Sequence, residues 1–282
     1  MATAPGTAFD ELVRIMRTLR APGGCPWDRE QTLQSLRPFV LEETYELLDA
    51  LDRQDLDGLR EELGDFLYEA VFLAQIAEEA GHFSIGDAVD GIARKLVRRH
   101  PHVFTADGRP LSEGSDITTG EVRRRWEDLK AEERASSGQA EKSALDGVPV
   151  TLPALLRAFE LTARAAAVGF DWRRPADVLD KIDEEMREVR AAVDDGAPGA
   201  VEEELGDLLF AVASYARKLG VEPEAALRTA SAKFQARFTR MEALARADGA
   251  ALANLSLDAQ NALWERVKAE QATAPASDPA AR

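Results

Sequence analysis

The sequence predicts an all-α protein built as a tandem duplication of one unit that is similar to a four-helix bundle. Apolar residues recur at helical spacing along nearly the whole chain of 282 residues, and no convincing alternating strand pattern interrupts them. Two acidic motifs each occur twice at the same separation, which indicates an internal repeat. The spacing predicts helices over residues 8–20, 29–53, 57–80, 84–100 and 118–135, and over 151–168, 176–195, 199–219, 222–247 and 256–270.

Local signals support several of these helix ends. Thr118 and Glu121 have the spacing of a capping box, and Gly81 and Gly220 stand where a helix terminator belongs. We expect an N-terminal domain over residues 1–135, a linker over 136–143, a C-terminal domain over 144–270 and a disordered tail over 271–282.

The composition excludes several classes of protein. With 35 Lys and Arg against 51 Asp and Glu, the net charge is −16, which disfavours binding of nucleic acid through a broad basic surface. Cys25 is the single cysteine and there are only three histidines, so neither an internal disulfide nor a structural Cys/His zinc site is expected. Because we also find no secretory signal and no membrane span, we expect a cytoplasmic protein without a membrane partner.

Four acidic residues of the first half have twins 142 positions later. The first set is Glu43, Glu46, Glu62 and Asp65, and the second set is Glu185, Glu188, Glu204 and Asp207. At about 100° per residue these acids share the apolar stripes of their helices. Burial of uncompensated carboxylates costs several kcal/mol each, so a cation is needed, although a solvated acidic face would explain a single isolated copy. Two such helices side by side would form an all-oxygen cage suited to Mg²⁺, with Mn²⁺ as a possible substitute.

A second repeated set combines cations with tryptophans at a separation of 138 positions. It consists of Lys95, Arg99, Trp126 and Lys130 in the first half, and Lys233, Arg237, Trp264 and Lys268 in the second half. Lys and Arg one turn apart could hold phosphate oxygens, and a Trp ring could stack on a nucleobase. The alternatives are an exposed basic face and a core anchor.

The motifs together identify a family resemblance that covers roughly residues 9–270. The chain resembles the MazG family of nucleoside triphosphate pyrophosphohydrolases, which have two tandem all-α domains. The resemblance is carried by Gly24-Cys-Pro-Trp-Asp28, Leu41-Glu-Glu-Thr-Tyr-Glu46, Glu62-Leu-Gly-Asp65, Arg98-Arg-His-Pro-His-Val-Phe104, Leu152-Pro-Ala-Leu-Leu156, Val168-Gly-Phe-Asp-Trp172, Glu185-x-x-Glu188 and Glu204-Leu-Gly-Asp207. It implies Mg²⁺-dependent hydrolysis of ribo- and deoxynucleoside triphosphates to monophosphate and pyrophosphate, a homodimer, and a housekeeping role in the nucleotide pool.

Carried over residue by residue, the resemblance makes residues 144–270 the principal catalytic unit. It implies Glu185, Glu188, Glu204 and Asp207 as metal ligands and Lys233, Arg237 and Trp264 as nucleotide contacts. Glu184 or Glu185 is then a candidate general base, and the first half is either weakly active or structural. Glu160 and Ala163 stand where the family often has lysines, which weakens any phosphate contact from that helix. A module that senses nucleotides or binds partners without turnover, and a purely structural bundle, are the alternative functions.

Overall fold

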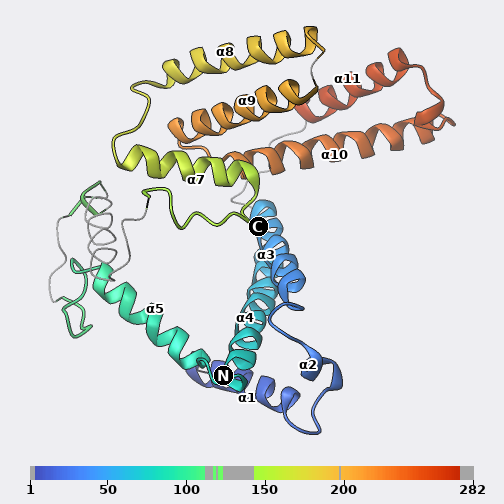
Figure 1. The fold of residues 1–282 in the computed structure, drawn as a ribbon. Coiled ribbons are helices and arrows are strands. Elements are labelled where there is room, and N and C mark those ends of the chain that lie inside the picture. Colours follow the sequence, from blue (N-terminus) through green and yellow to red (C-terminus); the bar gives the residue numbers. More distant parts are fainter. Residues whose placement is uncertain (1–3, 112–116, 119, 123–142, 197, 274–282) are drawn as a thin grey trace. The chain divides into compact units, whose positions relative to one another are not determined.

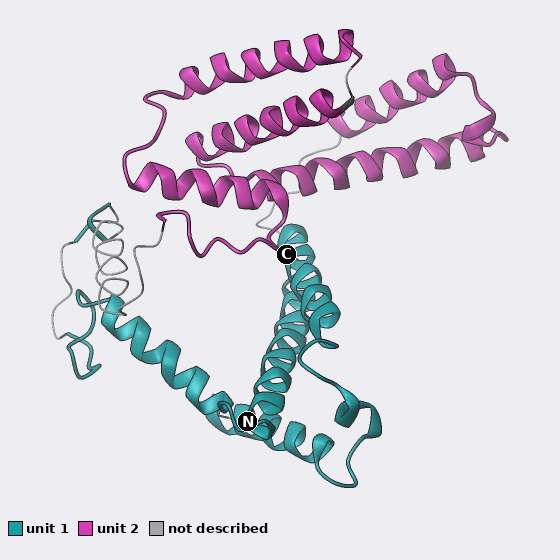
Figure 2. Ribbon diagram, in the orientation of Figure 1, with its two compact units in different colours: residues 1–139 teal, residues 140–282 magenta. Residues whose placement is uncertain are grey.

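The computed structural model describes residues 4–111, 117–118, 120–122, 143–196 and 198–273. Helices dominate these ranges, and the only bridge between extended segments in them joins Phe104 and Pro110. The chain divides into two compact units, residues 1–139 and 140–282 (Figure 2). The protein is therefore all-α, as the sequence predicts.

The first unit is built around a hairpin of two long helices (Figure 1). Its helices are α1 (Pro5–Arg20), α2 (Pro26–Glu30), α3 (Arg37–Arg53), α4 (Leu56–Glu79) and α5 (Ile85–Arg99). Helix α4 packs against α1, α3 and α5. Met16, Leu36, Val71 and Phe72 form the centre of the core, so α1, α4 and the start of α3 share one apolar interior.

The predicted helix 29–53 is wrong in one respect, because it is two helices separated by residues 31–36. Within that gap the Thr32 and Ser35 side chains accept hydrogen bonds from each other's backbone N–H groups, at 3.1 and 2.9 Å. Short polar side chains of this kind compete with helical backbone bonds. Pro38 lies in the first turn of α3, where its missing backbone N–H leaves no helical hydrogen bond unmade, so the new helix can begin there.

The second unit contains an equivalent hairpin, formed by α8 and α9. The elements of this unit are α7 (Ala154–Ala167), α8 (Pro175–Asp194), α9 (Pro198–Lys218), α10 (Pro223–Ala247), the short 3₁₀ helix η1 (Leu252–Asn254) and α11 (Leu257–Thr273). Helix α9 packs against α8 and α7, and α10 packs against α11 (Figure 1). Met241, Leu244 and Val267 join α10 to α11 in a separate core cluster.

The two hairpins turn at equivalent positions. Gln54, after α3, has a left-handed φ of 56°, and Gly196, which lies 142 residues later, has a φ of 68° after α8. Glycine adopts this conformation without steric cost, whereas glutamine does so at some expense. Gly81 and Gly220 are also left-handed, at the ends of α4 and α9, which confirms them as helix terminators.

Several predicted boundaries fall at the edge of the described residues. The Thr118 hydroxyl accepts a hydrogen bond from the Glu121 backbone N–H, which confirms the capping interaction, and residues 120–122 are helical. The rest of the predicted helix 118–135, the linker residues 136–142 and the tail residues 274–282 lie outside the described residues. The first three tail residues are helical, because α11 continues to Thr273. No described helix has the length and apolar character needed to cross a membrane.

Candidate functional site

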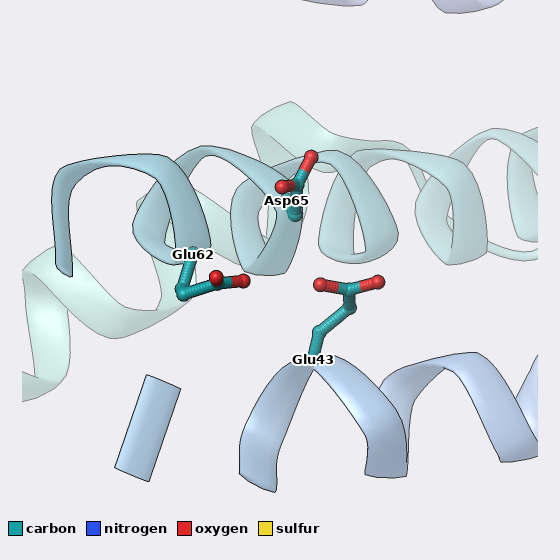
Figure 3. A group of neighbouring side chains, drawn as sticks. All are labelled: Glu43, Glu62 and Asp65. Atoms are coloured by element: carbon teal, nitrogen blue, oxygen red, sulfur yellow. The ribbon is translucent and has the colours of Figure 1, made fainter. Parts of the chain in front are cut away.

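Each hairpin brings three carboxylates together. In the first unit Glu43 on α3 faces Glu62 and Asp65, which lie one turn apart on α4 (Figure 3). In the second unit Glu185 and Glu188 on α8 face Glu204 on α9. Within each triad, one carboxylate oxygen of every residue lies within 4.8 Å of the others. An all-carboxylate donor set of this kind suits a hard divalent cation such as Mg²⁺ or Mn²⁺.

The acids of the first triad destabilise one another's charge. Burial, followed by the charges of Asp65, Glu46 and Glu62, raises the pKa of Glu43 above its usual range. The pKa of Glu62 is also raised, first by burial and then by the charges of Glu46 and Asp65. Glu46 lies outside the 4.8 Å triad, yet its charge acts on both residues. A bound cation would relieve this repulsion.

A lysine side chain lies beside the acids of the second triad. Lys181, one turn before the triad on α8, places its Nζ 2.6 Å from Glu184 and 2.7 Å from the buried Glu185. These two carboxylates raise the pKa of Lys181, and Lys181 in turn lowers the pKa of Glu184, which makes Glu184 a poorer proton acceptor. Burial and a hydrogen bond with Glu185 raise the pKa of Glu188. Sequence reasoning missed Lys181, although its i, i+3 and i, i+4 spacing to the two acids was a usable signal.

A cavity of about 800 Å³ opens beside this triad. Glu185 and Asp207 contribute to its lining, so Asp207, which lies outside the 4.8 Å triad, still faces the same space. Lys181 supplies positive charge to the wall, and Phe170 and Trp172 supply aromatic surface. This volume falls within the range of small-molecule sites, about 300–1,000 Å³. Sequence reasoning gave no role to Phe170 or Trp172, because only the fold shows that their loop lies against α8 and α9.

Asp171 fixes the loop that carries these two aromatic residues. Its carboxylate accepts a hydrogen bond from Arg217 at 2.5 Å and another from Lys218 at 2.6 Å, both at the end of α9. Burial alone would raise the pKa of Asp171, but the two cations outweigh that effect and hold its pKa below the usual range. Arg217 also donates to the Thr162 hydroxyl on α7 at 3.1 Å, so three segments meet at this point.

Two of the predicted nucleotide contacts of the second half, Arg237 on α10 and Trp264 on α11, lie against each other. The Arg237 guanidinium lies 5.7 Å from the centre of the Trp264 ring, and Phe234 lies 5.5 Å from the same ring. Lys233 is exposed, and Lys268 pairs with Glu265 at 2.7 Å. The lining of the 800 Å³ cavity includes none of the predicted contacts on these two helices. Their binding roles stay predictions.

The equivalent residues of the first half are only partly described. Lys95 is exposed and Arg99 is half-buried, both on α5. Trp126 and Lys130 lie outside the described residues. The binding roles of all four therefore also stay predictions.

Comparison with known proteins assigns the family. The MazG nucleotide pyrophosphohydrolase domain matches this chain twice, over residues 31–104 and 173–241, and each match contains one acidic triad. The chain belongs to the MazG family. It is 47% identical to the nucleoside triphosphate pyrophosphohydrolase of Escherichia coli (strain K12) over 268 residues, which cover 93% of this chain and 98% of that protein. It is 43% identical to the nucleoside triphosphate pyrophosphohydrolase/pyrophosphatase MazG of Thermotoga maritima over 263 residues, which cover 93% and 96% of the two chains. The double match confirms the tandem duplication.

Proposed function

We propose that this chain hydrolyses nucleoside triphosphates to nucleoside monophosphate and pyrophosphate, and that the C-terminal half carries the reaction. The single observation that supports this most strongly is the triad of Glu185, Glu188 and Glu204 beside a nucleotide-sized cavity. Membership of the MazG family and the names of the two relatives point to the same reaction and to a role in maintaining the nucleotide pool.

The side chains around the cavity would have different roles in binding the metal and the phosphates. Glu185, Glu188 and Glu204, with Asp207, would hold Mg²⁺ or Mn²⁺. When bound, such a cation neutralises charge on the triphosphate and lowers the pKa of water at the site. Lys181 adds a positive charge to the wall of the cavity, and this charge would stabilise the negative charge that develops on the departing pyrophosphate.

Phe170 and Trp172 offer surfaces on which a base can stack. Stacking accepts every nucleobase, so these two rings would not select among the bases. Lys181 pairs with both Glu184 and Glu185, but only Glu185 lines the cavity, so Glu185 is the better placed candidate for the proton acceptor. Lys233, Arg237, Trp264 and Lys268 remain proposed contacts for the nucleotide.

We also propose that the chain forms a homodimer and acts in the cytoplasm. Leu205, Leu209 and Val212 are large apolar side chains that α9 leaves exposed. A second copy that covered this surface would remove it from water, and two-fold homodimers are the commonest assemblies of this kind.

Product analysis of the purified full chain tests the proposed reaction. Each common ribo- and deoxynucleoside triphosphate is incubated with and without Mg²⁺, and pyrophosphate, orthophosphate and monophosphate are measured. We expect Mg²⁺-dependent pyrophosphate and monophosphate, which Glu204→Gln abolishes and Glu203→Gln, an exposed neighbour on the same helix, leaves unchanged. Release of orthophosphate and diphosphate would contradict the assigned bond, and absence of product would favour a nucleotide-sensing module.

A further inference from the structure

The helix that carries Glu62 and Asp65 has one more acid on the same face, one turn after Asp65, and no described residue gives its Oε2 atom a hydrogen bond. Glu69 lies one turn beyond Asp65 on α4 and is only 6% exposed. Its Oε2 atom is buried and makes no hydrogen bond to any described residue. A buried carboxylate oxygen without a partner costs several kcal/mol, so a group of this kind calls for a cation or a donor.

The electrostatic surroundings of Glu69 link it to the triad. Burial and then the charges of Glu43 and Asp65 raise the pKa of Glu69 to about 7. All three causes act in the same direction. Glu69 therefore lies within the electrostatic field of Glu43 and Asp65, although it is not one of the three acids within 4.8 Å of one another.

The duplicated halves differ at two equivalent positions, and both differences change the charge. The twin of Glu69 in the second half is Ala211, so that half lacks the extra acid. The twin of Lys181 in the first half is Phe39, which packs against the core and lies edge-on to Trp27 at 5.7 Å. The first triad thus has an additional acid and no lysine at this position, whereas the second triad has a lysine 2.7 Å from one of its acids.

We propose that Glu69 supplies a further oxygen to a divalent cation that the first triad binds in the absence of nucleotide. The second triad, whose charge Lys181 partly offsets, takes up its cation together with the phosphates of the substrate. The cation of the first half is then structural, because it ties α3 to α4. This inference extends the proposed metal binding, but it concerns the half of the chain to which the proposed reaction is not assigned.

Binding of Mn²⁺ to the nucleotide-free full chain tests the inference, by isothermal calorimetry and by electron paramagnetic resonance of the free ion. We expect one tight site per chain. Glu69→Gln, which keeps the side-chain volume, should weaken that site roughly 10- to 100-fold. Glu61→Gln, an exposed acid on the same helix, and Glu204→Gln should leave it unchanged. Lys181→Met supplies a test that does not depend on Glu69, because it should create a second tight site.

Three outcomes would overturn the inference: no tight Mn²⁺ site without nucleotide, an unchanged site in Glu69→Gln, or loss of the site in Glu204→Gln. Absence of a second tight site in Lys181→Met would overturn the role given to the lysine. Turnover is measured on the same samples. Failure of wild-type hydrolysis would refute the proposed reaction alone, because the Mn²⁺ titration needs no nucleotide.

Discussion

The interaction of Asp171 with two cations makes a quantitative prediction that links stability to substrate binding. Asp171→Asn keeps the shape of the side chain but removes the charge that Arg217 and Lys218 share. The side chains of Asp171, Arg217 and Lys218 are 25%, 13% and 16% exposed. The substitution would therefore leave two largely buried cations without the negative charge that they share. Loss of one partner of a buried pair costs about 3–5 kcal/mol, and loss of an exposed pair about 0–1 kcal/mol. We expect the free energy of unfolding to fall by about 2 kcal/mol, between these limits.

The effect of this substitution depends on pH in a direction that the pKa fixes. The folded pKa of Asp171 lies below its unfolded value of about 3.9. The stabilisation is therefore fully present above that unfolded value and is lost as the pH falls through the folded pKa. The stability difference between the wild type and Asp171→Asn should be complete at neutral pH and should shrink below about pH 4.

Urea denaturation of the full chain, followed by circular dichroism at several pH values, measures this difference. Asp49→Asn is the control, because its ion pair with Arg53 is exposed at both ends and should contribute less than about 1 kcal/mol. We also expect a higher KM for nucleotide with little change in kcat, since the loop that carries Phe170 and Trp172 is loosened. If Asp171→Asn is no less stable than Asp49→Asn, or if their difference does not change with pH, the reasoning is refuted.

Three further outcomes follow from the structure. Glu204→Gln should lower kcat/KM for pyrophosphate release at least roughly 100-fold, and a loss no larger than that in Glu203→Gln would remove Glu204 from the proposed site. Chelation with EDTA should abolish hydrolysis, and Mg²⁺ or Mn²⁺ should restore it; full activity in excess EDTA would exclude a role for the metal. Phe72→Ala should reduce the free energy of unfolding by about 3–5 kcal/mol in urea, since Phe72 is fully buried at the centre of the first core; a change below about 1 kcal/mol would contradict that placement.

The sequence predicted the positions of both triads because helical periodicity and a duplicated motif act together. Glu43 and Glu62 belong to neighbouring helices, and their place on the apolar stripes predicts that they face each other. The structure brings them together as expected. Glu46 and Asp207 were expected in the same cages, but only three acids of each set lie within 4.8 Å. Periodicity predicts the face of the helix on which a residue lies, but it does not predict the rotamer that decides how closely two side chains approach.

The remaining features of the site depend on contacts between distant segments. Trp172 is 35 positions before Asp207 in the sequence, yet both line one cavity because α8 and α9 fold back on each other. The break between α2 and α3 was missed for a local reason, since the reciprocal bonds of Thr32 and Ser35 replace helical bonds within an otherwise periodic segment. Nothing in the sequence singles out Glu69, because the burial that distinguishes it from the other acids of α4 is a property of the fold.

The left-handed turns at Gln54 and Gly196 fix the length of each hairpin, and this length determines whether the proposed metal ligands of the two helices face each other. In both halves 16 positions separate the second acid of the repeated set from the third, from Glu46 to Glu62 and from Glu188 to Glu204. One residue inserted at either turn would rotate the following helix by about 100° and would carry its carboxylates away from their partners. Most surface loops tolerate insertions and deletions. At these two turns, however, a change of one residue would separate the carboxylates of the two helices.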